Sequence, residues 1–201
     1  MQQRILWAER VPNAPYPMRI ADLARLPDDG YTYEIVEGEL LRMPGSGVEA
    51  SRIAARLIIA LGSYVEAHGL GDVLGADGTY DLTQPGDPTE TALVPDVSFA
   101  LAGRLPVTGT PAAKGYAKLA PDLVAEVASP SQYRPEMKSK AELYLARGVR
   151  LVWIIWPSRQ EVDVWRPAAA IAPVATLTPA DNLDGLDVVP GFTYPLTKLF
   201  A

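Results

Sequence analysis

The chain has 201 residues, of which 48% are hydrophobic and 21% are charged, and its formal net charge is −6. A chain of this length and composition is expected to fold as one globular domain with a sizeable core. The absence of cysteine excludes disulfides and thiolate metal sites, and the single histidine, His68, excludes a multi-histidine zinc site. The acidic balance argues against a broad basic surface for nucleic acid, although it is compatible with a small basic groove.

No stretch of the sequence reaches the about 18 apolar residues that a membrane-spanning helix needs. The N-terminus also lacks the pattern of a signal peptide. We therefore expect a protein that does not enter a membrane and that works in the cytoplasm.

The chain divides into a short arm and one domain. Residues 1–17 are rich in proline and polar residues, which predicts an irregular N-terminal arm. Residues 18–201 contain no internal repeat and no linker, and they predict a single domain. Helical and strand patterns alternate along this domain, which predicts an α/β fold with a mixed β-sheet flanked by helices.

The clearest element is a helix over Glu49–His68, whose apolar residues recur on one face and which Gly69 ends. Two apolar runs, Leu123–Ala128 and Leu151–Trp156, predict buried strands. The other expected elements are a short helix over Met18–Leu26, a hairpin of Tyr31–Val36 and Glu39–Met43, strands near 72–74, 79–82 and Val94–Leu101, a loop over Gly103–Ala120, a helix over Glu136–Arg147, a strand over Val162–Trp165, and a tail of short strands and turns over 168–201.

Two carboxylates lie inside apolar strand patterns. Glu126 lies in the run Leu123–Ala128, and Asp96 lies in the run around Val94-Pro95-Asp96-Val97. A buried carboxylate is unfavourable unless it is paired or bound to a metal. Without cysteine and with one histidine, a metal at these acids would be bound by oxygen, which favours Mg²⁺ or Mn²⁺.

Simpler roles for these acids stay open. Glu126 could pair with an arginine such as Arg134 or Arg150. Asp96 could accept hydrogen bonds from main-chain N–H groups at the start of a strand. Lys140 could be an ordinary exposed residue of its helix.

An ordered set of short motifs resembles the Uma family, which is similar to the PD-(D/E)XK restriction-endonuclease superfamily. The resemblance runs from about Met18 to the C-terminus. It rests on Tyr33-Glu34, Gly38-Glu39-Leu40, Pro95-Asp96-Val97, Pro121-Asp122-Leu123-Val124-x-Glu126-Val127-x-Ser129-Pro130-Ser131, Lys140-x-x-x-Tyr144, Gly148-Val149 and Trp153-Ile154. It implies a restriction-endonuclease-like core.

The resemblance also implies a metal-dependent endonuclease that hydrolyses phosphodiester bonds in DNA. Asp96, Glu126 and the main-chain carbonyl of Val127 would hold one Mg²⁺ or Mn²⁺. The metal would lower the pKa of a bound water and stabilise charge on the attacked phosphate. Lys140 would orient that water and balance the developing charge.

One further acid is expected near this centre. In the resemblance Glu39 would serve as an outer ligand or as the superfamily's extra acid, and Glu34 fits that position less well.

The chain departs from the family pattern at three positions. Ala128 stands where a lysine is expected two residues after Glu126, and the resemblance suggests that Lys140 on the next helix replaces it. Ala50 matches a histidine near the start of the long helix. Trp156 stands where an acid is expected in a Trp-x-x-Asp-Pro pattern.

These departures and the acidic charge keep other functions open. One is a binding or assembly module on a nuclease-like scaffold without catalysis. Another is a hydrolase of a different phosphorylated substrate, such as a nucleotide or RNA. A base-stacking role for Trp153, Trp156, Trp165 and Tyr144 competes with simple core packing, which their apolar strands favour. A homodimer is compatible with the sequence, because dimers are the commonest oligomers.

Overall fold

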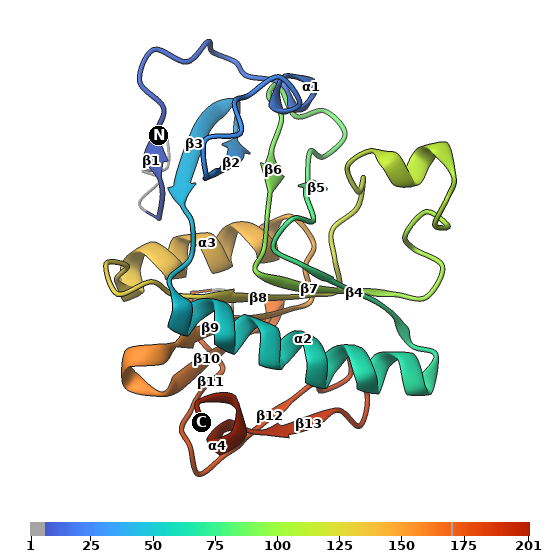
Figure 1. Cartoon of the computed structure of the whole chain (residues 1–201), viewed down its shortest axis with the longest axis vertical. Helices are drawn as coiled ribbons and strands as arrows, with labels where there is room; N and C mark the ends of the chain where they lie inside the picture. Colours follow the sequence, from blue (N-terminus) through green and yellow to red (C-terminus); the bar gives the residue numbers. More distant parts are fainter. Residues whose placement is uncertain (1–6, 170) are drawn as a thin grey trace.

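The computed structural model describes residues 7–169 and 171–201. Two main sheets and two long helices form the α/β fold, and the expected class of a mixed sheet flanked by helices is confirmed (Figure 1). No helix in the described part of the chain is long and apolar enough to span a membrane.

A six-stranded sheet forms the centre of the molecule. Its strands have the order β11-β10-β9-β8-β7-β4, and only β8 and β9 run parallel. The strands are β4 (Gly71–Gly75), β7 (Val97–Leu101), β8 (Leu123–Val127), β9 (Leu151–Trp156), β10 (Glu161–Trp165) and β11 (Ala175–Leu177). All residues of β8 and β9 are buried, as their apolar runs predict.

A long helix covers each face of this sheet (Figure 1). On one face, α2 (Val48–His68) buries Ile53, Leu57, Leu61 and Val65, and Gly69 ends it with a left-handed backbone. On the other face, α3 (Arg134–Ala146) connects the parallel strands β8 and β9. The helices expected over Glu49–His68 and Glu136–Arg147 are thus found with small shifts at their ends.

The side chains of β8 alternate between the two faces. Leu123, Ala125 and Val127 join the core under α2, whereas Val124 and the following Ala128 join the core next to α3. By this period of two, Glu126 points to the face of α3.

A five-stranded sheet packs over α3, on the side away from α2 (Figure 1). Its strand order is β1-β3-β2-β6-β5, and all its pairs are antiparallel. The expected hairpin is found, and its turn residues Glu37 and Gly38 both have positive φ. The strands are β1 (Glu9–Arg10), β2 (Tyr31–Val36), β3 (Glu39–Pro44), β5 (Tyr80–Asp81) and β6 (Ala92–Leu93).

The segment Val94–Leu101 is not the single strand that the sequence predicts. The chain leaves β6 in the five-stranded sheet, crosses through Val94, Pro95 and Asp96, and only then enters β7 in the six-stranded sheet. Pro95 suits this crossing, because it has no N–H to contribute to either ladder. Asp96 therefore lies in the bend before β7 rather than inside a strand.

The N-terminal segment is more ordered than the irregular arm expected over residues 1–17. Residues 1–6 lie outside the described residues. Glu9 and Arg10 form β1 on the edge of β3, and the neighbouring Trp7 is buried with 6% of its surface exposed.

Short elements complete the fold. The tail packs against α2 as a two-stranded sheet and a final helical turn, in agreement with the expected short strands and turns. These elements are α1 (Ile20–Leu23), η1 (Pro111–Lys114), η2 (Pro157–Arg159), η3 (Pro167–Ala169), β12 (Asn182–Asp184), β13 (Thr193–Pro195) and α4 (Leu196–Leu199).

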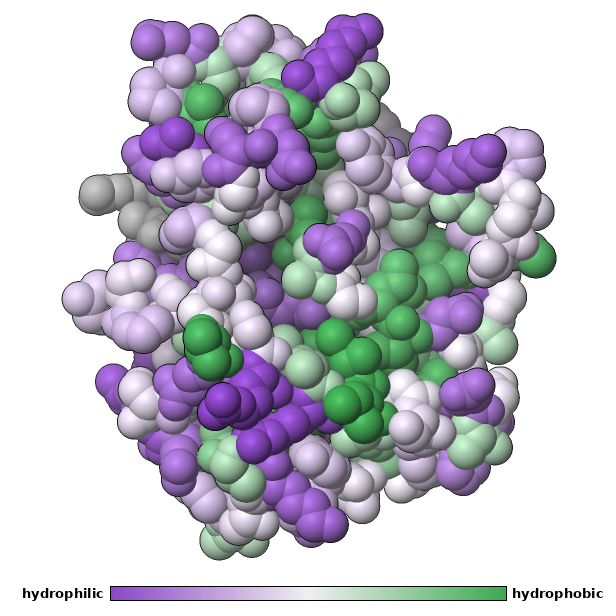
Figure 2. All heavy atoms as spheres, in the orientation of Figure 1, coloured by the Kyte–Doolittle hydropathy of each residue, from purple (hydrophilic) through white to green (hydrophobic). Residues whose placement is uncertain are grey.

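The face of the molecule formed by α2 is partly apolar. Figure 2 shows hydrophobic side chains gathered over α2 and the neighbouring β4. Ile59, on the outer side of α2, is 68% exposed. This surface lies on the opposite side of the six-stranded sheet from Lys140 and Tyr144.

Candidate active site

A buried carboxylate on β8 is the centre of the site. The Nζ atom of Lys140 lies 2.9 Å from Oε1 of Glu126, and the hydroxyl of Tyr144 donates a hydrogen bond of 2.7 Å to the same oxygen. Lys140 and Tyr144 lie on one side of α3 because they are four residues apart. Helix α3 therefore presents an ammonium and a phenol to Glu126 together.

A second carboxylate, that of Glu34, also forms an ion pair with the ammonium of Lys140. Oε1 of Glu34, in β2, lies 3.2 Å from Nζ of Lys140 and accepts a hydrogen bond of 3.0 Å from the main-chain N–H of Val94. The indole N–H of Trp7 donates to the other oxygen of Glu34, with 3.2 Å between the heavy atoms. The side chain of Glu34 is fully buried.

The expected preference for Glu39 over Glu34 is wrong. Glu39 pairs with Arg10, with 2.8 Å between the charged groups, and it does not line the cavity that contains Asp96 and Glu126. The two residues lie on adjacent strands, and the turn between them carries Glu39 to the edge formed with β1. Glu34 instead lies where β2 faces α3.

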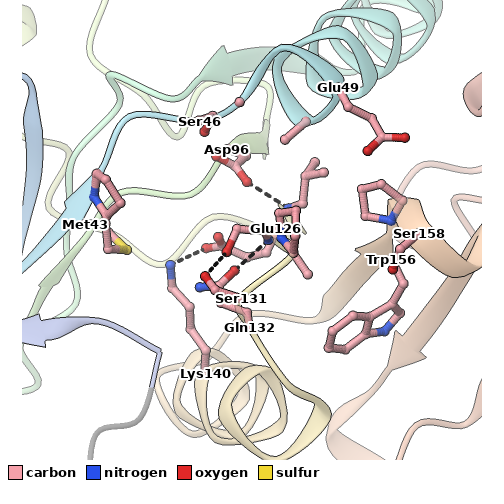
Figure 3. A pocket seen from close by; sticks show the side chains of 18 of the residues that line it. Met43, Ser46, Glu49, Asp96, Glu126, Ser131, Gln132, Lys140, Trp156 and Ser158 are labelled. Atoms are coloured by element: carbon pink, nitrogen blue, oxygen red, sulfur yellow. Dashed lines mark hydrogen bonds and ion pairs between the residues drawn. The ribbon is translucent and has the colours of Figure 1, made fainter.

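Asp96 approaches from the opposite side. Its Oδ2 atom accepts a hydrogen bond of 2.7 Å from the main-chain N–H of Val127, the residue after Glu126. Figure 3 shows Asp96 on the side of α2 and Lys140 on the side of α3, with Glu126 between them. The structure thus brings Asp96, Glu126, Val127 and Lys140 together, and their roles stay predictions.

These contacts shift the pKa values of the groups. Burial raises the pKa of Glu126 to about 8, against the opposing attraction of Lys140. Burial also raises the pKa of Asp96, although the Val127 hydrogen bond opposes this shift. For Tyr144, burial and then the charge of Glu126 raise the pKa, so its hydroxyl stays a donor.

Lys140 keeps its charge. Burial alone would lower its pKa, but the attraction of Glu126 and Glu34 is stronger, and the pKa lies above the ordinary value for lysine. The site therefore joins three carboxyl groups to one ammonium.

A cavity of about 660 Å³ opens above these groups. Its floor includes Asp96, Glu126, Val127 and Lys140, and its rim includes the loop before α2 and the loop after β8 (Figure 3). The loop after β8 is fixed by Gln132, which accepts from Ser129 N–H and donates to the carbonyl of Trp7.

Neither arginine that could have neutralised Glu126 does so. Arg134 pairs with Asp163 and Glu161. Arg150 contacts Asp187 and, at 3.6 Å, Asp122. The ion pair that the structure gives to Glu126 is the one with Lys140.

The tryptophan at the expected acid position has a structural role. The indole N–H of Trp156 donates to Asp163, and the guanidinium of Arg134 lies over the Trp156 ring at 5.3 Å from its centre. Trp153, Trp156 and Trp165 are at most 5% exposed, and Tyr144 is fully buried. Core packing, rather than base stacking, is therefore the correct interpretation of this aromatic set.

The residues fit a hard divalent cation. Among the described residues, no group of three or more His, Cys, Asp or Glu side chains is placed to hold a metal ion. Asp96, Glu126 and Val127 nevertheless line one cavity, and their oxygens are of the kind that Mg²⁺ prefers while it keeps several of its waters. Three carboxyl groups face one ammonium, so the site carries negative charge that a cation would offset once Glu126 ionises.

Two residues of the site have no clear signal in the sequence. Trp7 lies in the segment expected to be an irregular arm, and Gln132 lies in a loop. A tryptophan in a polar, proline-rich stretch is the one hint that this segment is anchored to the domain.

Fold and site together define a nuclease-like α/β protein. A solved structure titled "Crystal structure of a putative nuclease belonging to DUF820 from Anabaena variabilis ATCC 29413" shares the fold, with a TM-score of 0.71 and 21% identity. The similarity covers 92% of this chain and 98% of that one. A comparison with curated proteins gave no match.

The chain belongs to the Uma2 family, described as "Putative restriction endonuclease", which matches residues 20–197. The family expected from the motifs is therefore confirmed.

Trp7→Phe should destabilise the protein by about 1–3 kcal/mol, because it leaves an oxygen of the buried Glu34 without its donor. Denaturant unfolding of both proteins measures this loss. Trp165→Phe is the matched control, because the buried Trp165 Nε1 has no hydrogen-bond partner among the described residues. Equal losses for the two variants would show that the Trp7–Glu34 bond contributes nothing.

Proposed function

We propose that this chain is a metal-dependent endonuclease that hydrolyses phosphodiester bonds in DNA. The observation that supports it most is the meeting of Asp96, Glu126 and Lys140 at the floor of one cavity. Membership of the Uma2 family supports a nuclease. The homodimer and the cytoplasmic location stay predictions.

Each residue has a distinct part in this proposal. Asp96, Glu126 and the Val127 carbonyl would hold one Mg²⁺ or Mn²⁺. The bound metal lowers the pKa of water and offsets charge on the attacked phosphate. Lys140 contributes a fixed positive charge beside the developing charge of the phosphate.

Other residues position these groups. Glu34 and Glu126 hold the Lys140 ammonium between them, at 3.2 and 2.9 Å. Tyr144 fixes one oxygen of Glu126 and leaves the other oxygen for a cation. A lysine held at two points loses little freedom during the reaction, which favours catalysis.

Asp96→Asn should lower cleavage of DNA in Mg²⁺ or Mn²⁺ by about 100-fold or more, because it removes a negatively charged ligand. The rate of cleavage of labelled DNA measures this, and a melting curve checks the fold. Glu39→Gln is the matched control, since Glu39 lies outside the cavity and should leave the rate unchanged.

Full activity of Asp96→Asn would contradict the metal mechanism. Loss of activity in Glu39→Gln would instead support the catalytic role that the family resemblance implies for Glu39. A wild-type protein that binds metal but cleaves no DNA would favour a scaffold without catalysis.

Stabilisation by Mg²⁺ should increase as the pH rises from 6 to about 8. Because the pKa of Glu126 is raised to about 8, a proton competes with the metal below that pH. Without metal, the free energy of unfolding should fall as the pH rises from 4.5 to about 8. In this range the unfolded chain has released the Glu126 proton, whereas the folded chain still holds it.

Melting temperatures with and without millimolar Mg²⁺, at pH 6.0, 7.0 and 8.5, measure the difference. Glu126→Gln should abolish both the metal shift and its pH dependence. A metal shift that is equal at all three pH values would contradict the role of Glu126 as a ligand.

A further inference from the structure

The reacting groups lie well below the surface. The side chain of Lys140 is 2% exposed and that of Glu126 is 6% exposed. A phosphate can meet them only by entering the cavity of about 660 Å³, which has the size of a small-molecule site. A continuous duplex is a stiff rod, whereas a flexible unpaired strand can bend to bring one phosphate down into such a cavity.

The wall of the cavity carries as many acidic as basic side chains. Its charged side chains are three acids, Glu49, Asp96 and Glu126, and three bases, Arg134, Lys140 and Arg159. Lys140 and Arg134 are held in ion pairs with buried carboxylates. The wall therefore supplies few basic contacts to phosphates, and a nucleic acid bound here needs another source of affinity.

An aromatic side chain stands at the entrance instead. Tyr133, just before α3, lines the cavity and is 68% exposed. Its main-chain N–H donates to Glu136, which fixes the backbone and leaves the ring in solvent. Exposed aromatic rings beside a binding groove stack unpaired bases of any sequence.

From these observations we infer that the substrate is an unpaired nucleic-acid strand, with Tyr133 stacking a base beside the phosphate that enters the cavity. The inference rests on the proposed hydrolysis. The oxygen of a water forms the new P–O bond, and the P–O bond to a sugar oxygen breaks. That sugar oxygen takes up a proton, and the water releases one.

Cleavage assays test this substrate class directly. A labelled single-stranded DNA oligonucleotide, the same strand annealed to its complement, and an RNA of the same sequence are incubated with the protein and Mn²⁺. The single strand should be cleaved at least about tenfold faster than the duplex. Comparison with the RNA shows whether the unpaired strand is DNA or RNA. Cleavage of the duplex at the same rate as the single strand, or faster, overturns the inference.

Variants of Tyr133 test the stacking role. Tyr133→Ala should weaken binding of the single strand about fivefold or more, whereas Tyr133→Phe should keep it. Tyr16→Ala is the matched control, because Tyr16 is 63% exposed and lines a separate small cavity. Unchanged binding by Tyr133→Ala, or an equal loss in Tyr16→Ala, overturns the role of Tyr133.

Binding to Glu126→Gln separates this inference from the proposed function. Fluorescence anisotropy measures the affinity of this variant for each oligonucleotide when cleavage is blocked. A preference for the single strand that depends on Tyr133 supports the inference, even if the wild-type protein cleaves nothing. A preference for the duplex overturns it, even if the protein is an active nuclease.

Discussion

The buried ammonium of Lys140 is the contact on which the site depends. It joins Glu34 on β2 with Glu126 on β8 and thereby connects the five-stranded sheet, α3 and the six-stranded sheet. A buried ion pair is weak evidence for stability, because removing the charges from water costs about as much as their attraction returns. The pair of carboxylates on Lys140 is therefore weak evidence for stability by itself, but removal of the lysine would leave two buried carboxylates without their cation.

The position of this lysine explains a departure from the family pattern. Ala128 follows Glu126 on the same face of β8 and is buried against α3. The ammonium arrives from α3 instead, because the crossover from β8 to β9 lays that helix along the strand that carries Glu126. A small residue at position 128 leaves room for this packing, and the same charge reaches the same carboxylate.

Much of this arrangement could be predicted from the sequence. Strong apolar patterns located β8, β9, α2 and α3, and an acid inside an apolar strand singled out Glu126. The resemblance to the Uma family then linked Lys140 to it. The apolar patterns are local signals, because each depends on residues along one helix or one strand.

The rest depends on contacts between distant segments. Whether Glu34 or Glu39 meets the lysine is decided by how the hairpin packs on α3, and the bond from Trp7 spans 27 positions in the chain. The bend at Asp96 exists because the chain changes sheets there. Neither the spacing of apolar residues nor a turn motif predicts these contacts between distant residues. They form only when the two sheets pack together.

The site carries an excess of acidic groups over basic ones. Asp96 and Glu126 have raised pKa values because burial and neighbouring acids disfavour their charged forms. Buried carboxylates that repel one another are tolerated in a folded core only where an opposite charge lies close to them. Lys140 supplies such a charge. The remaining negative charge would attract a divalent cation and repel a polyanion until that cation is present. If the proposed cation binds, the same electrostatics that hold the lysine in place would favour its binding before a nucleic-acid strand enters.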